Sequence, residues 1–304
     1  MEQTTSHTSL LRLLSNQMAD AVERIAPSLV LVDGRTQRPA SGIVYAPNLV
    51  LTAAHVLERE NNLTIQTFDK RTLPAKFVGH DLGTDLAVLR TADLGLAVAT
   101  SSEEPARVGQ LVIAVGRSSV EGHMASSGIV SAVGGPLRTA QGSVLERYIR
   151  TDAIPYPGFS GGALIDTQGA IIGVLTTGLA NSVAMAIPMD IARAIADTLA
   201  TQGYIKRGYL GISSQLVELP PAQRAGRTTQ EYGLLIVKVD ENSPAQRGGI
   251  LVGDILLTLD GHVLHDAEAL QLLLTGDRVG KTVPVEVIRG NAVQTLQVPI
   301  GQRN

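Results

Sequence analysis

The sequence contains no cysteine among its 304 residues. This absence excludes disulfides, thiolate zinc sites and cysteine nucleophiles. A strong charge of either sign is also lacking, because 25 basic side chains stand against 28 acidic ones and the formal net charge is -3. The net charge is therefore too small to attract nucleic acid or an anionic bilayer, and a protein or small-molecule substrate is expected.

Long apolar runs are rare, and only residues 167–189 need a membrane test, because they contain no charged residue and are long enough to cross a bilayer. Polar residues and glycines interrupt this segment, and residues 171–175 are rich in β-branched side chains. The segment therefore predicts two buried strands joined by a loop and no membrane span.

Targeting and cofactor signals are absent as well. The amino terminus has no basic start followed by an apolar core and a small-residue cleavage site. As written, the chain is expected in the cytoplasm, or outside it if an export segment was removed before residue 1. There is no His-Glu-Xaa-Xaa-His motif and no carboxylate-rich calcium loop, so the expected chemistry uses no metal and no cofactor.

The chain is mostly a series of short strand-like segments. A helical period of apolar residues predicts an amphipathic helix over residues 10–25, packed against the body of the protein. From Ser28 to about Pro188, strand-like segments are separated by turn residues in the manner of a sandwich or barrel. A helix starting near Pro188 and stopping at Gly203 precedes a smaller unit, from Tyr204 onward, in which strands mix with two helices.

Residues 155–169, PYPGFSGGALIDTQG, place Ser160 among glycines and before a strand-like segment. Glycine and serine are common turn residues, so this string alone does not make Ser160 a nucleophile. A serine hydroxyl needs a base that takes its proton, and that base needs an anion that orients it. Partners for Ser160 must therefore come from elsewhere in the chain.

His55 and Asp85 are the candidate partners. His55 closes a strand-like segment in the same unit as Ser160, and Asp85 directly precedes a fully apolar strand. Asp81 and Asp93 are alternative carboxylates. Polar residues at strand ends usually cap or solvate the strand, so each assignment stays open when it is taken alone.

In chain order, three segments resemble the His, Asp and Ser segments of trypsin-like serine proteases: LTAAHV (51–56), TDLAVL (84–89) and GFSGGALID (158–166). They resemble most the HtrA/Deg group, which joins a protease to a carboxy-terminal PDZ domain. The resemblance covers roughly residues 20–300. It implies a mostly β fold of two six-stranded antiparallel barrels, chymotrypsin-like, over residues 10–203, followed by a PDZ domain over residues 204–302.

The same resemblance implies the roles of the site residues. His55 would be the general base, Asp85 its orienting anion and Ser160 the nucleophile. The backbone N–H groups of Gly158 and Ser160 would form the oxyanion hole, in which one donor contributes about 3 kcal/mol or more. The string around Ser160 also fits the nucleophile elbow of α/β-hydrolases, but that fold requires a helix after the serine and a later histidine, and neither requirement is met well.

Two features depart from the HtrA pattern. Phe159 stands where the group usually has Asn, and Ala163 where it usually has Pro. Because Phe159 offers no polar contacts, the resting loop is expected to be collapsed or unusually mobile, and the enzyme slow or ligand-activated. The group commonly forms trimers through amino-terminal aromatic residues, but none precedes Tyr45 here, so the apolar face of residues 11–25 is an alternative contact surface for a homo-oligomer.

Two binding sites for peptides are expected. Residues 176–181 and 182–188 would wall the primary pocket, and because none is charged they favour a small or medium aliphatic residue before the scissile bond. In the second unit, a string resembles the carboxylate-binding loop of PDZ domains, beside which a peptide would add as a strand. This site would comprise Tyr209, Leu210, Gly211 and Ile212, with Leu270 and Leu274 lining its pocket.

The sequence thus predicts a serine endopeptidase that cleaves unfolded or damaged proteins, with a PDZ domain that binds peptide C-termini. The alternative is a peptide-binding scaffold or chaperone whose protease unit is inactive or latent.

Overall fold

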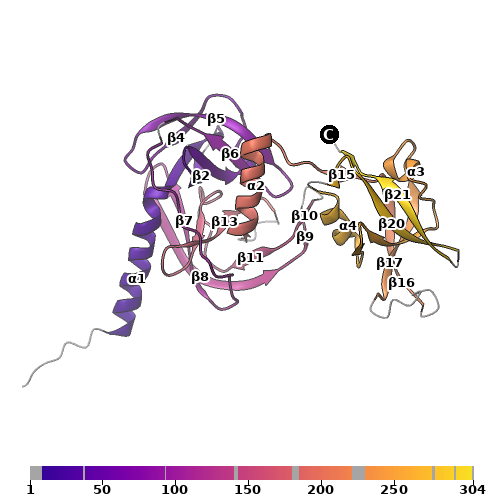
Figure 1. The fold of residues 1–304 in the computed structure, drawn as a ribbon. Helices are drawn as coiled ribbons and strands as arrows, with labels where there is room; N and C mark the ends of the chain where they lie inside the picture. Colours follow the sequence, from indigo (N-terminus) through magenta and orange to yellow (C-terminus); the bar gives the residue numbers. More distant parts are fainter. Residues whose placement is uncertain are drawn as a thin grey trace, which may run out of the picture. The chain divides into compact units, whose positions relative to one another are not determined.

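A computed structural model describes residues 9–36, 38–92, 94–139, 143–179, 185–220, 230–275, 278–290 and 292–302. The chain divides into two compact units, Met1–Tyr204 and Ile205–Asn304. Figure 1 shows strands in the majority in both units.

The first unit begins with helix α1 (Leu10–Ile25), which has the bounds that the apolar spacing predicts. Only the second half of this helix packs on the body of the protein, where Ala21 and Ile25 are buried. Leu10 and Leu11 are 82% and 77% exposed. The expectation that the whole helix lies against the protein is therefore correct only for its carboxy-terminal part.

The first barrel is closed and antiparallel, with the strand order β1-β2-β3-β6-β5-β4. Its interior holds apolar side chains from alternate positions of the strands, because successive side chains of a strand point to opposite faces. A short 3₁₀ turn, η2 (Ala54–Val56), follows its third strand. The strands are β1 (Leu29–Asp33), β2 (Ala40–Ala46), β3 (Leu49–Ala53), β4 (Leu63–Gln66), β5 (Thr72–Asp81) and β6 (Leu86–Arg90).

The second barrel is also closed and antiparallel, in the order β11-β14-β13-β12-β7-β8. A separate pair of two-residue strands, β9 (Leu137–Arg138) and β10 (Val144–Leu145), lies outside it. The barrel strands are β7 (Leu111–Ser118), β8 (Gly122–Gly134), β11 (Tyr148–Thr151), β12 (Ala163–Ile165), β13 (Ile171–Thr176) and β14 (Met185–Pro188). Two six-stranded antiparallel barrels confirm the predicted fold class.

The uncharged segment 167–189 forms β13 and β14, which are neighbours in the second barrel. The prediction of two buried strands is therefore correct. In the part of the chain that the structure describes, no helix has the length and apolar character to span a membrane.

Helix α2 (Met189–Gln202) holds the two barrels together, because it packs on β5 and β6 of the first and on β13 and β14 of the second. It ends at Gly203 in the left-handed conformation that favours glycine, with φ 81. Tyr45 in β2 reaches the helix, where its hydroxyl donates to the carbonyl of Ala196 at 3.2 Å.

The second unit is built on a sheet in the order β16-β17-β18-β20-β21, in which β16 is an edge strand. The two described helices of this unit each have a capping side chain, since Ser243 and Asp266 accept from the N–H groups three residues on. The elements are β15 (Gly208–Tyr209), β16 (Ile212–Glu218), β17 (Tyr232–Val239), α3 (Pro244–Arg247), β18 (Ile255–Leu259), β19 (His262–Val263), α4 (Ala267–Leu273), β20 (Thr282–Arg289), β21 (Ala292–Pro299) and β22 (Gly301–Gln302).

His123 lies in β8 opposite Arg117 of β7. Its Nε2 is buried and has no hydrogen-bond partner among the described residues. Burial, and secondarily the positive charge of Arg117, lower the pKa of His123 below its ordinary value of 6.5, although a hydrogen bond with the Ala26 backbone opposes them. The folded protein therefore favours the neutral imidazole.

This environment predicts a loss of stability in acid. His123 binds a proton more readily in the unfolded chain than in the folded one. The free energy of unfolding therefore decreases as the pH is lowered below the unfolded pKa. Melting temperatures between about pH 8 and about pH 5 should fall more steeply for the parent than for His123→Gln. His80→Gln, a change on β5 at another partly exposed histidine, is the control, and parallel pH profiles for parent and His123→Gln would contradict the prediction.

Candidate active site

His55 and Asp85 lie together at the end of the first barrel. His55 is in η2, directly after β3, and Asp85 directly precedes β6, the strand paired with β3. The His55 ring Nδ1 is 2.7 Å from Asp85 Oδ2, and the His55 backbone N–H donates to Oδ1 at 2.8 Å. The two carboxylate oxygens therefore hold both the ring and the main chain of the histidine.

The hydrogen bond to Asp85 sets the tautomer of the neutral His55 ring. The Asp85 side chain is 4% exposed, whereas that of His55 is 33% exposed. An ionised carboxylate can only accept hydrogen bonds, so Nδ1 carries the proton that it shares with Asp85. In the neutral ring this leaves Nε2 without a proton and able to accept one, as a general base requires.

The alternative carboxylates do not occupy this position. Asp81 is the buried last residue of β5, and its Oδ2 accepts from the Thr84 hydroxyl at 2.7 Å. Asp93 lies outside the described residues.

A segment of the second barrel, Thr176–Gly178, touches all three predicted catalytic residues. The Thr176 hydroxyl donates to Asp85 Oδ2, and the Thr177 hydroxyl is 3.3 Å from the hydroxyl of Ser160. A Cβ at Gly178 would lie 2.5 Å from Asp85 Oδ2 and 2.7 Å from His55 Nδ1, so only glycine fits. Sequence reasoning assigned this segment to the pocket wall and missed these contacts, since no local pattern signals them.

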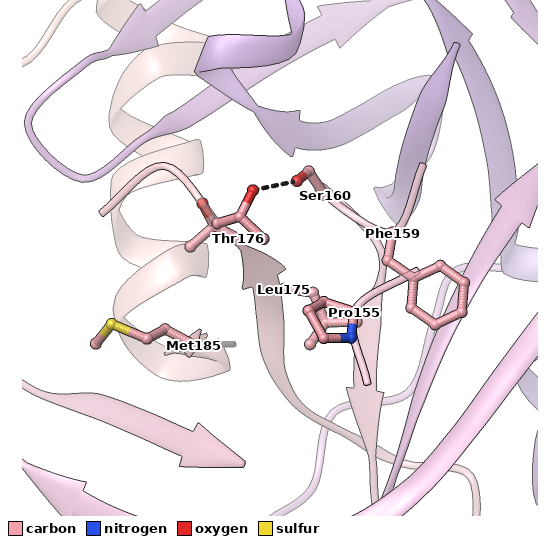
Figure 2. A pocket seen from close by; sticks show the side chains of 7 residues that line it. Pro155, Phe159, Ser160, Leu175, Thr176 and Met185 are labelled. Atoms are coloured by element: carbon pink, nitrogen blue, oxygen red, sulfur yellow. Dashed lines mark hydrogen bonds between the residues drawn. The ribbon is translucent and has the colours of Figure 1, made fainter. Parts of the chain in front are cut away.

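Ser160 lies in the loop between β11 and β12, and it faces this segment in Figure 2. Its hydroxyl is paired with that of Thr177, and no hydrogen bond joins it to His55 among the described residues. The structure thus brings His55 and Asp85 into direct contact. It brings Ser160 to the same segment, Thr176–Gly178, without a direct bond to the histidine.

Two N–H groups of the main chain around Ser160 have no hydrogen-bond partner among the described residues. Within the described part of the chain, the carbonyls of Gly158, Phe159 and Ser160 each accept a hydrogen bond, and the N–H groups of Phe159 and Gly161 each donate one. The N–H groups of Gly158 and Ser160 have no such partner. These two are the expected oxyanion donors, and Gly158 has φ 97, a conformation that side chains disfavour.

Phe159 differs from its expected role. It was expected to leave the loop collapsed or mobile, but its side chain is 1% exposed and belongs to the core of the second barrel. The ring packs on Gly116, where any side chain would collide with it, and meets Tyr156 edge-on at 5.5 Å. In Figure 2 it points away from the Ser160 hydroxyl. Phe159 is therefore an apolar anchor for the loop.

A small pocket lies beside Ser160, and none of its described lining residues is charged. Residues 180–184 of the predicted wall lie outside the described residues. The pocket is lined by Pro155, Phe159, Ser160, Leu175, Thr176, Thr177 and Met185.

In the second unit, the predicted peptide loop has a comparable arrangement. The carbonyls of Leu210 and Gly211 accept from Ala245 and Asp240 at 2.8 Å and 2.9 Å, whereas their N–H groups have no partner among the described residues. Gly211 has φ 78.

The predicted peptide residues differ in exposure. Tyr209, in β15, is 36% exposed. Ile212 is partly buried and begins the edge strand β16. Leu270 and Leu274 are 5% and 8% exposed and belong to the core of this unit, so the side chains expected to line a pocket are mostly covered.

Several known proteins are similar to this chain. A probable periplasmic serine endoprotease, DegP-like, of Halomonas elongata is 33% identical over 265 residues, which are 85% of this chain and 55% of that protein. The protein of the same name from Ectopseudomonas mendocina is 31% identical over 92% of this chain and 60% of its own length. The chain thus spans little more than half the length of these curated relatives.

Solved structures are similar over nearly their whole length. The HtrA-type protease AlgW with a tripeptide matches with a TM-score of 0.82 at 28% identity, covering 94% of this chain and 97% of that one. A serine endoprotease from Yersinia pestis matches with a TM-score of 0.76, also at 28% identity, covering 95% and 98% of the two chains.

Two family models complete the comparison. The trypsin-like peptidase domain matches residues 40–174, and the PDZ domain matches residues 208–300. Two closed barrels with His55 and Asp85 paired at their junction, followed by this second unit, define a trypsin-like peptidase with a PDZ domain. Together with the relatives above, these matches show that the chain belongs to the HtrA family of serine proteases.

Proposed function

We propose that this chain is a serine endopeptidase in which His55, Asp85 and Ser160 form the catalytic triad. The observation that carries the proposal is the pairing of His55 with the buried carboxylate of Asp85, which leaves Nε2 as a proton acceptor. The two unpaired N–H groups of Gly158 and Ser160 support it.

The proposed reaction follows from these positions. The Ser160 hydroxyl leaves Thr177, gives its proton to His55 Nε2 and attacks the substrate carbonyl. The resulting oxyanion binds the N–H groups of Gly158 and Ser160, while Asp85 stabilises the imidazolium. His55 then protonates the leaving amine, and water hydrolyses the acyl-enzyme by the same proton transfers in reverse.

The proposed substrates are unfolded or damaged proteins. The pocket beside Ser160 is small and lacks charged side chains, which supports cleavage after a small or medium aliphatic residue. An anionic floor that would bind Lys or Arg is absent from the described lining.

The second unit is proposed to bind peptide C-termini. The unpaired N–H groups of Leu210 and Gly211 can receive a terminal carboxylate, and the free edge of β16 can pair with the peptide as an added strand. Similar HtrA-type structures carry a bound tripeptide or decapeptide, which supports this assignment. We assign residues 10–203 to the protease domain and 204–302 to the PDZ domain.

Two further predictions concern localisation and oligomeric state. The matched relatives are named periplasmic, which favours the extracytoplasmic alternative, and nothing supports the cytoplasmic expectation. A homo-oligomer stays a prediction, for which the exposed Leu10 and Leu11 of α1 offer an apolar contact surface.

The decisive experiment is covalent labelling of the full chain with a fluorophosphonate, together with cleavage of an unfolded protein such as casein. We expect a single label at Ser160 and cleavage that Ser160→Ala abolishes. A PDZ scaffold with an inactive protease unit would bind peptides but would neither react at Ser160 nor cleave. Addition of a peptide with a free C-terminus tests for latency, because a latent enzyme would react with the fluorophosphonate only when this peptide is present.

A further inference from the structure

Ser41, a residue of β2 that sequence reasoning did not select, contacts the loop of Ser160 from the first barrel. It is fully buried. Its hydroxyl donates to the carbonyl of Gly158 at 2.7 Å and accepts from the N–H of Arg117 at 2.8 Å. Its own N–H donates to the carbonyl of Ser160 at 3.1 Å. One buried side chain and its main chain thus bind both residues of the proposed oxyanion hole.

These contacts fix two peptide planes. Because a peptide unit is planar, a carbonyl and the following N–H are oriented together. The plane after Gly158 is held by the Ser41 hydroxyl at one end and by the Tyr156 carbonyl, which accepts from Phe159, at the other. The plane after Ser160 is held by the Ser41 N–H and by the Leu175 carbonyl, which accepts from Gly161.

Gly158 depends on the hydroxyl of Ser41 more than the other loop residues do. Glycine can adopt either sign of φ at little cost, so its own conformation does not hold it at φ 97. A Cβ there would meet its nearest atoms only at 3.4 Å, so packing does not hold it either. Without the Ser41 hydroxyl, the Gly158 carbonyl and the Arg117 N–H would both lose their partner inside the protein.

We propose that Ser41 is a positioning residue for the oxyanion hole. Its hydroxyl anchors the Gly158 carbonyl and so fixes the peptide plane that lies between the N–H groups of Gly158 and Ser160, which keeps both N–H groups in place for the substrate. The inference rests on the proposed function. It adds a residue of the first barrel that controls transition-state binding in the loop of the second, without touching the substrate.

The test uses Ser41→Ala in the full chain, with Tyr45→Phe as the matched control. Both changes remove a buried hydroxyl of β2 that donates to a main-chain carbonyl, but the partner of Tyr45 is Ala196 in α2. On a peptide substrate, kcat of Ser41→Ala should fall about 100-fold with KM changed less than about threefold. Tyr45→Phe should keep kcat within about threefold of the parent.

A second measurement separates positioning from general loosening. A peptidyl trifluoromethyl ketone forms a hemiketal with the serine, and its oxygen occupies the oxyanion hole. Its affinity should fall in Ser41→Ala by about the same factor as kcat/KM, while the affinity of the corresponding peptide amide stays unchanged. Ser41→Cys fills the same space with a weaker hydrogen-bonding group and should give an intermediate loss. If the alanine variant does not fold, the test is made with Ser41→Cys.

The outcomes are distinct. Equal kcat values for the parent and a folded Ser41→Ala or Ser41→Cys variant would overturn the inference and leave the proposed function intact. Equal losses in Tyr45→Phe and Ser41→Ala would also overturn it, since the effect would then be general. If the parent forms no hemiketal and cleaves no peptide, the proposed function fails and the inference fails with it.

Discussion

Ser160→Ala and His55→Ala are each expected to lower kcat by about a millionfold, and the double variant is expected to lose no more than either one. The reason is that the hydroxyl and the imidazole act in one proton transfer. Once the hydroxyl is gone, the free Nε2 of His55 has no proton to take. Once the imidazole is gone, the hydroxyl keeps the proton that it must lose in order to attack.

This prediction is checked by steady-state kinetics of the three variants on one peptide substrate, with the background hydrolysis measured in parallel. Fluorophosphonate labelling of His55→Ala should slow by several orders of magnitude while Ser160 itself is still present. Thr177→Val is measured alongside these variants, because it removes the hydroxyl that pairs with the Ser160 hydroxyl in this structure. A double variant whose loss equals the product of the two single losses would contradict the proposed pairing.

Asp85→Asn is expected to lower kcat by about 10⁴-fold, because the amide imposes the wrong tautomer on His55. Oδ1 of Asp85 accepts from the His55 backbone N–H, so an amide nitrogen at that position would face another donor. The nitrogen therefore takes the position of Oδ2, where it donates to Nδ1 and where the Thr176 hydroxyl can rotate from donor to acceptor. The proton of the neutral ring then moves to Nε2, which can no longer accept a proton from Ser160.

Asp81→Asn is the matched control for this variant. Asp81 is also buried, ends β5 just before the turn to Asp85, and accepts from a threonine hydroxyl, that of Thr84. We expect its kcat to stay within about tenfold of the parent. A loss in Asp81→Asn as large as that in Asp85→Asn would mean that the turn, and not the charge beside His55, controls activity.

Local patterns in the sequence predicted much of this protein. The apolar period of residues 10–25 defines α1, and Pro188 and Gly203 bracket α2. Short strands separated by turns predicted barrels, because one face of each strand must be buried. The segments around His55, Asp85 and Ser160 marked the candidate site, because in that order they resemble the His, Asp and Ser segments of the HtrA group.

The tertiary structure alone decided how the site is held. The burial of Phe159, the contacts of Thr176–Gly178 and the position of His123 in β8 differ from what the local sequence indicates or leave no mark in it. Ser41 is the clearest example, because it and Gly158 are 117 residues apart. Composition and periodicity indicate where strands, helices and turns form along the chain. A hydrogen bond between two barrels depends on where their surfaces meet, and only packing of the whole unit sets that.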